Sequence, residues 1–200
     1  MTITSGNVPA DSGKLSMPFK KNTQWQYAVQ SEESLPAIHQ ASNEPWTTSI
    51  AESHISSQLS VAVILGFPSD LVWAEPDQKK KLSIITLRQD GLWFNKHTNS
   101  DSPISLIESV LAGQQLGEHV LKPNPQIGDH ISEEGGSRYG WTVESEITFK
   151  GLPGWRLLFR TNPDHQYLDF VPTIGFSRFE YVHHGTVQNV TAELQSLDIP

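Results

Sequence analysis

Hydrophobic and polar residues alternate along most of this chain, as they do in β-strands that bury one face. Between positions 24 and 30, Trp25, Tyr27 and Val29 alternate mostly with glutamines. The same period of two recurs in the segments 46–50, 141–147 and 155–160. This pattern predicts antiparallel strands that pack one face on a core and expose the other to water.

Two other segments add detail to this pattern. Leu59–Leu65 is apolar at nearly every position, which predicts a central strand covered on both faces. Asp90-Gly91 separates the predicted strands 82–87 and 92–94, and glycine there supplies the positive φ of a tight hairpin turn. Near the C-terminus, the segments 174–182 and 186–197 predict a last hairpin that turns at His183-His184-Gly185.

One segment has the spacing of a helix instead. Ser102 precedes Pro103, which suits the first helical position because its missing N–H has no partner there in any case. Ile104, Ile107 and Val110 then follow at intervals of three residues, and glycine occurs at 113. The sequence therefore predicts one short helix at about 103–113.

About ten strands and one helix predict an all-β fold, either an antiparallel sandwich or a partial barrel. Strands and helices do not alternate along the chain, which argues against a doubly wound sheet. We expect a single domain over residues 17–198, preceded by a Ser- and Gly-rich flexible leader over 1–16.

Composition excludes several classes of function. The formal net charge is −8, and the one basic run, Lys79–Lys81, fits a solvated loop, so we expect no nucleic-acid partner. The chain has no cysteine, which excludes disulfides and thiolate metal sites. Its longest apolar run, 61–65, is too short for a membrane span. Residues 1–13 lack signal-peptide features, which leaves either a cytoplasmic location or a removed export signal.

Several short phrases resemble a known type of domain. They are Pro18-Phe-Lys-Lys-Asn-Thr-Gln-Trp-Gln-Tyr27, Thr173-Ile-Gly-Phe-Ser-Arg-Phe-Glu-Tyr181, Gly66-Phe-Pro-Ser-Asp70 and His183-His-Gly-Thr-Val187. The chain resembles TapB-like, uncharacterised β-domains of bacterial secreted proteins and lipoproteins, with Thr173 at a position where that pattern usually has glycine. The resemblance implies an all-β binding or structural domain in the periplasm or outside the cell. It assigns no catalytic residue.

The C-terminal quarter carries the candidate chemistry. His165, His183 and His184 are candidate metal ligands, with Asp164 or Asp169 as the acid, because two histidines and a carboxylate suit Zn or Fe. Neighbouring residues of a strand point to opposite faces, so only one of His183 and His184 could join such a cluster. The alternative is a turn in which one histidine binds backbone and the other meets water.

Asp164 and His165 could instead form a general acid–base pair, and Asp169 completes the set of catalytic candidates. The alternative is that Pro163-Asp164 only fixes a turn. Trp73 lies beside turn residues, and we interpret it as a rim residue. It forms a candidate ligand-binding set with Asp70, Tyr181 and Arg178.

These observations favour a non-enzymatic extracytoplasmic binding or structural domain whose partner is a small molecule, a glycan or another protein. Two alternatives stay open. One is a metal-dependent or His/Asp acid–base enzyme that uses the C-terminal cluster, and the other is a calycin-like barrel that binds a small apolar ligand. If the protein is a non-enzymatic binding or structural domain, we expect it to have no cofactor.

Overall fold

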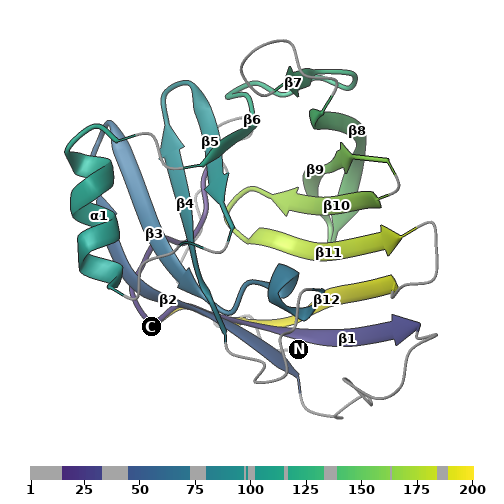
Figure 1. Ribbon diagram of the computed structural model, residues 1–200, viewed down its shortest axis with the longest axis horizontal. Helices are drawn as coiled ribbons and strands as arrows, with labels where there is room; N and C mark the ends of the chain where they lie inside the picture. The colour runs from purple at the N-terminus through teal and green to yellow at the C-terminus, as the bar shows by residue number, and fades with distance from the viewer. Residues whose placement is uncertain are drawn as a thin grey trace.

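The structure is a computed structural model of the chain. It describes residues 15–32, 45–72, 80–96, 98, 102–114, 117–132, 139–162, 164–183 and 189–200. Within these ranges, twelve strands form one antiparallel sheet in the order β6-β5-β4-β3-β2-β1-β12-β11-β10-β9-β8-β7 (Figure 1). All neighbours pair antiparallel, and most of them are also neighbours along the chain, as short connections require.

The strands lie at β1 (Gln24–Glu32), β2 (Trp46–Ile55), β3 (Leu59–Leu65), β4 (Leu82–Arg88), β5 (Gly91–Asn95), β6 (Glu118–Leu121), β7 (His130–Ser132), β8 (Gly140–Phe149), β9 (Leu152–Arg160), β10 (Asp164–Val171), β11 (Gly175–His183) and β12 (Asn189–Asp198). The expectation of a partial barrel is confirmed, but the count of about ten strands is too low. β6 and β7 are only four and three residues long, so an alternating pattern hardly develops in them.

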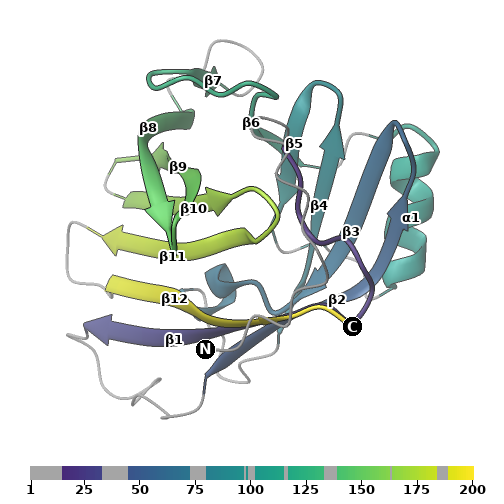
Figure 2. The ribbon, with the colours of Figure 1, turned by 180° about the vertical axis from the view of Figure 1, so that it is seen from behind.

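The sheet curls into a nearly closed barrel. The two edge strands of the sheet, β6 and β7, lie beside each other (Figures 1 and 2), and β6 also contacts β8. Side chains join the two edges. Trp141 Nε1 donates to Glu118 Oε2 at 3.0 Å, and Lys122 Nζ, just after β6, donates to Asp129 Oδ1, just before β7, at 2.7 Å. Closure of this kind protects strand edges that would otherwise pair with other chains.

Aromatic side chains fill the middle of the barrel. Phe67, which precedes the short 3₁₀ helix η1 (Pro68–Leu71), packs edge-on against Phe94, Phe176 and Phe179 at ring-centroid distances of 4.6 to 6.1 Å. These four rings are at most 3% exposed. The segment after β3 therefore enters the barrel as a plug, and ligands have to bind at the ends or on the outside of it.

The helix α1 (Pro103–Leu111) covers part of the outer surface. Ser102 caps it by accepting a hydrogen bond from the Ser105 amide, as predicted from Ser102-Pro103. Leu106, Ile107 and Val110 pack on Val61 and Val63, which face outward from β3. The prediction that this strand is covered on both faces is therefore confirmed.

The predicted hairpin at Asp90-Gly91 is also confirmed. Gly91 has a φ of +132°, and a Cβ atom there would lie 2.1 Å from the Leu121 carbonyl oxygen of the neighbouring β6. Glycine at this turn thus serves both the backbone conformation and the close approach of a third strand.

Candidate functional site

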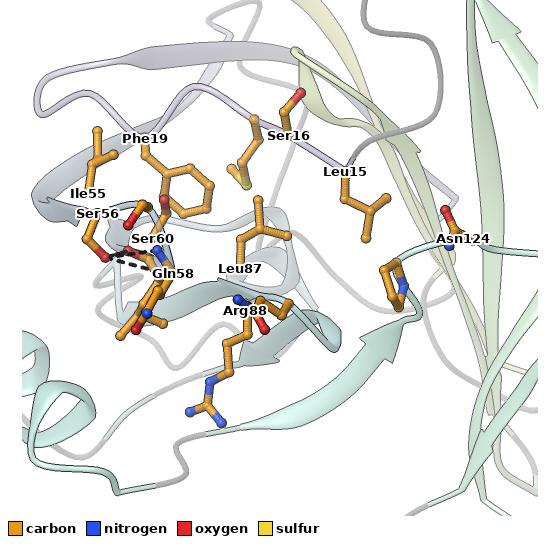
Figure 3. Close-up of a pocket in the computed structure, with 15 residues that line it drawn as sticks. Leu15, Ser16, Phe19, Ile55, Ser56, Gln58, Ser60, Leu87, Arg88 and Asn124 are labelled. Atoms are coloured by element: carbon orange, nitrogen blue, oxygen red, sulfur yellow. Dashed lines mark hydrogen bonds between the residues drawn. The ribbon is translucent and has the colours of Figure 1, made fainter.

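A cleft of about 820 Å³ opens at one end of the barrel (Figure 3). β2 and β4 end there, and β3 begins there. The chain before β1 forms a further wall with Leu15, Met17 and Phe19, which are each less than 8% exposed. The cleft is thus an opening between rigid strand ends and a well-packed N-terminal segment.

The lining of this cleft is half apolar and half hydroxyl or amide. Aliphatic surface comes from Leu15, Ile55, Leu59 and Leu87. Hydrogen-bonding groups come from the serines and amides at Ser16, Ser56, Ser57, Gln58, Ser60, Gln89 and Asn124. Among the described residues that line the cleft, Arg88 is the one with a charged side chain. A cleft with this lining can hold an aliphatic group and a polar or anionic end at the same time.

Arg88 connects the cleft to a second cavity. That cavity, of about 570 Å³, shares four lining residues with the first and extends toward Val110 and Gly113 at the end of α1. The shared residues are Gln58, Leu59, Arg88 and Gln89. The Arg88 guanidinium lies 5.2 Å from the ring centroid of Trp93 and forms no ion pair with any residue that the structure describes. Its hydrogen-bond donors therefore remain available to an incoming anion.

A different group of polar side chains faces the interior at the opposite end of the barrel. Asp164 begins β10 and stands directly across from His183, the last residue of β11, and His183 Nδ1 hydrogen-bonds Asp164 Oδ1. Tyr181 lies two residues before His183 on the same face. Burial, followed by a hydrogen bond to Asp164, raises the pKa of Tyr181 to about 12.

Lys96 extends this polar group toward the seam of the barrel. Its ammonium donates to Gln166 Oε1 at 2.5 Å, and Gln166 stands across from Tyr181. The ammonium lies 5.3 Å from the Trp141 ring centroid and 5.9 Å from that of Phe159. Loss of hydration in these surroundings lowers the pKa of Lys96 to about 8, although Glu118 nearby opposes the shift.

The structure separates the other candidates of the C-terminal quarter. His165 pairs with Val182 in the ladder, so it points outward, away from Asp164 and His183. Asp169 also points outward, where Arg156 binds it through two hydrogen bonds of 2.7 and 2.8 Å. The same contact raises the pKa of Arg156. Asp164, His165 and Asp169 therefore do not form one catalytic group.

The candidate metal site is divided in the same way. His165 and His183 lie on opposite faces of the sheet, so they cannot share one ion, and His184 lies outside the described residues. Among the described residues there is no group of three histidine, aspartate or glutamate side chains that could hold a metal. The alternative that Pro163-Asp164 fixes a turn involves Pro163, which lies outside the described residues; Asp164 begins β10, and its carbonyl accepts a hydrogen bond from the Thr161 amide at 2.7 Å.

The candidate ligand contacts are scattered over the molecule. Asp70, in η1, is buried, and its Oδ2 accepts a hydrogen bond from the Lys81 amide at 2.8 Å. Arg178 lies on the outer face beside Glu180 and Glu193, whereas Tyr181 faces the interior. Trp73 lies outside the described residues. The three of them that the structure describes, Asp70, Arg178 and Tyr181, therefore do not line a common site.

Sequence reasoning missed the large cleft and two charged residues. The cleft is built from serines and leucines at strand ends, which carry no chemical signature. The alternation of the segment 155–160 places Arg156 on the polar face of a strand, and the sequence pattern gives no signal for Lys96. Arg156 stands at an outward position of an alternating strand, and an outward arginine beside an outward aspartate could have indicated the ion pair once the pairing of strands was known.

Comparison with known proteins adds only a general likeness. Among the described residues, no helix has the length and apolar content to cross a bilayer. No family model and no curated protein matches the chain.

Two solved structures are similar to it. One is a candidate lipoprotein from Parabacteroides distasonis ATCC 8503, with 11% identity, a TM-score of 0.44, and coverage of 94% of this chain and 100% of that one. The other is a candidate exported protein with a YmcC-like fold from Bacteroides fragilis NCTC 9343, with 10% identity, a TM-score of 0.45, and coverage of 92% and 99%. At these values, what the chain does has to be argued from its own residues.

Proposed function

We propose that this protein is a non-catalytic binding protein that holds a small amphiphile, with an aliphatic body and an anionic end, in the 820 Å³ cleft. The observation that carries the proposal is the lining of the cleft, where aliphatic side chains and serines lie beside Arg88. The Arg88 side chain starts at the cleft and points away from Phe19 and Leu15, so its guanidinium can meet the anionic end of a ligand whose aliphatic body lies in the cleft (Figure 3). Phe19, the aromatic residue among the described lining residues, does not offer an open ring face, because it is only 5% exposed. The Trp93 ring lies under the Arg88 guanidinium, 5.2 Å from it. This arrangement favours a flexible aliphatic chain over a flat ligand.

The expected energetics are those of a weak to moderate binder. Burial of six methylene groups against the leucines contributes about 5 kcal/mol. A charge-assisted hydrogen bond from Arg88 to a carboxylate adds about 1.5 to 3 kcal/mol. Part of this is offset by the loss of ligand freedom, so micromolar affinity is a reasonable expectation.

Dodecanoate, below its micelle concentration, is a suitable probe and can be titrated by isothermal calorimetry at pH 7. We expect saturable binding at one site. Arg88→Gln should weaken it about tenfold, and Ser57→Trp, which narrows the mouth, should weaken it further. Arg160→Gln is the matched control, since Arg160 is an exposed arginine at the opposite end of the barrel. The proposal fails if dodecanoate does not bind saturably, or if Arg88→Gln binds as tightly as the unmodified protein.

A second candidate function comes from one specific observation, the contact of Asp164 with His183 beside Tyr181 and Lys96. An imidazole oriented by a carboxylate is the arrangement of a general base. An acid–base enzyme is therefore the alternative to binding alone. Hydrolysis of p-nitrophenyl esters that is abolished by His183→Gln, with the fold intact by circular dichroism, would favour it.

The predicted extracytoplasmic location rests on the resemblance of the segments 18–27 and 173–181. Fractionation of cells that express the full-length gene product, followed by immunodetection, tests it.

A further inference from the structure

A cavity of about 440 Å³ lies on the outside of the barrel, separate from both ends. Five strands, β8 to β12, contribute to it. Its polar lining includes the Arg156–Asp169 ion pair, Ser177, Arg178 and Glu193, and its apolar lining includes Phe149 near the tip of the β8–β9 hairpin. This volume is within the range of about 300 to 1,000 Å³ that is usual for small-molecule sites.

Two irregularities of the sheet meet at this cavity. Ser177 is an extra residue between the pairs Asp169–Arg178 and Phe170–Phe176, and its hydroxyl donates to the Asp169 carbonyl at 3.2 Å. Gln195 is a second extra residue, in β12 opposite β1. Both bulged residues line the cavity. Bulges redirect side chains and are frequent beside binding sites, so two of them at one cavity point to a built site.

Charges in the cavity are nearly balanced. Arg156 and Asp169 neutralise each other through their paired hydrogen bonds. Arg178 Nη2 lies 2.9 Å from Glu180, and Arg178 Nε lies 3.8 Å from Glu193. The lining thus carries two arginines and two carboxylates, Asp169 and Glu193, and Glu180 lies beside it. The guanidinium groups would repel a cationic ligand, and the carboxylates would repel an anionic one. The balance of charges therefore favours a neutral ligand.

One hydrogen-bond donor in this cavity has no acceptor. Arg178 Nε is buried and makes no hydrogen bond, and the Glu193 carboxylate is 3.8 Å away with its side chain 54% exposed. A hydroxyl group suits such a pair, because its oxygen can accept from the guanidinium while its hydrogen is donated to the carboxylate. Phe149 and Ile147 supply apolar surface next to these polar groups.

We propose that this cavity binds a neutral polyhydroxylated ligand, a single sugar ring or the end of a glycan. Arg178 and Glu193 bind its hydroxyl groups, and its C–H groups contact the apolar lining at Ile147 and Phe149. Lys150 Nζ lies 5.1 Å from the Phe149 ring centroid, so the contact does not require an open ring face. The bulged Ser177 and Gln195 are further hydrogen-bonding groups for the ring. This site does not depend on the amphiphile cleft, since the two share no residue.

Saturation-transfer difference NMR tests the site with the methyl glycosides of glucose, galactose, mannose and N-acetylglucosamine. We expect saturable binding of at least one glycoside, with a dissociation constant in the millimolar range. Arg178→Gln and Glu193→Gln should each raise that constant at least tenfold. Arg88→Gln is the control, because it changes an arginine of the other cleft and should leave glycoside binding unchanged.

Thermal unfolding of each variant shows whether weaker binding comes from the lost contact or from a lost fold. Because the Glu193 side chain is exposed, Glu193→Gln should fold even if Arg178→Gln does not. Dodecanoate binding should be unchanged in both variants, which distinguishes failure of this site from failure of the first. The proposal is wrong if no glycoside in the panel saturates, or if one binds equally well to the unmodified protein and Glu193→Gln.

Discussion

The Arg156–Asp169 ion pair, which forms one wall of the outer cavity, allows a quantitative test of the structure. Its two hydrogen bonds measure 2.7 and 2.8 Å, and the side chains of Arg156 and Asp169 are 27% and 8% exposed. Arg156→Gln leaves a nearly buried carboxylate without its cation. Breaking a buried pair in this way costs about 3 to 5 kcal/mol, and the partial exposure of Arg156 places the expected loss near the lower limit, about 3 kcal/mol.

The reverse change is milder. Asp169→Asn keeps one oxygen as an acceptor for Arg156, so the expected loss is about 1 to 2 kcal/mol. The double variant places a glutamine against an asparagine, which can hydrogen-bond each other without a buried charge. We therefore expect the double change to lower the free energy of unfolding by about 2 kcal/mol. This loss is smaller than the sum of the two single losses, and the difference is a coupling energy of about 2 kcal/mol.

Urea denaturation at pH 7, followed by tryptophan fluorescence, measures these differences. A domain of this size has a free energy of unfolding of about 5 to 15 kcal/mol, so every variant should remain folded without urea. The slope of the transition should not change, since the same surface is exposed on unfolding. Strictly additive losses, or a loss below about 0.5 kcal/mol for Arg156→Gln, would show that the pair behaves as an exposed ion pair and would refute the reasoning.

Three further predictions concern the interior. Phe67→Ala should lower the free energy of unfolding, measured by urea denaturation, by about 3 to 5 kcal/mol, because the Phe67 ring is 1% exposed and packs against three other rings. Phe67→Leu should lower it markedly less, and equal losses would contradict the role of Phe67 as a plug. Burial lowers the pKa of Lys96 to about 8 from its usual 10.5, so the free energy of unfolding should rise between these pH values, where the unfolded chain binds more protons. Lys96→Met should remove that rise, and a Lys96 side-chain NMR titration with a midpoint near 10.5 would exclude it. Asp164→Asn should lower the pKa of Tyr181 from about 12 toward 10 without reaching 10, since burial is the larger cause of the raised pKa. Absorbance at 295 nm, which follows the phenolate, measures this pKa. An unchanged pKa would show that Asp164 has no influence on Tyr181.

Local order could be predicted from the sequence where neighbouring residues decide it. The alternation around Trp25 and Trp141 identified strands, because a pleated chain directs successive side chains to opposite faces. The uninterrupted apolar run of β3 predicted burial on both sides, and the helix spacing after Ser102 predicted the element that covers its outer face. Asp90-Gly91 predicted a hairpin, because few residues other than glycine adopt its backbone conformation.

The arrangement of the candidate chemistry was decided by the tertiary structure. A period of two tells which face of a strand a residue occupies, but it does not tell which strands are neighbours or in what register they pair. Only the pairing of β10 with β11 brings Asp164 to His183 and Asp169 to Arg178. The cleft around Arg88 requires segments more than a hundred residues apart in the chain, from Leu15 to Asn124. Contacts of such long range follow from how the whole sheet curls and closes, which no local pattern records.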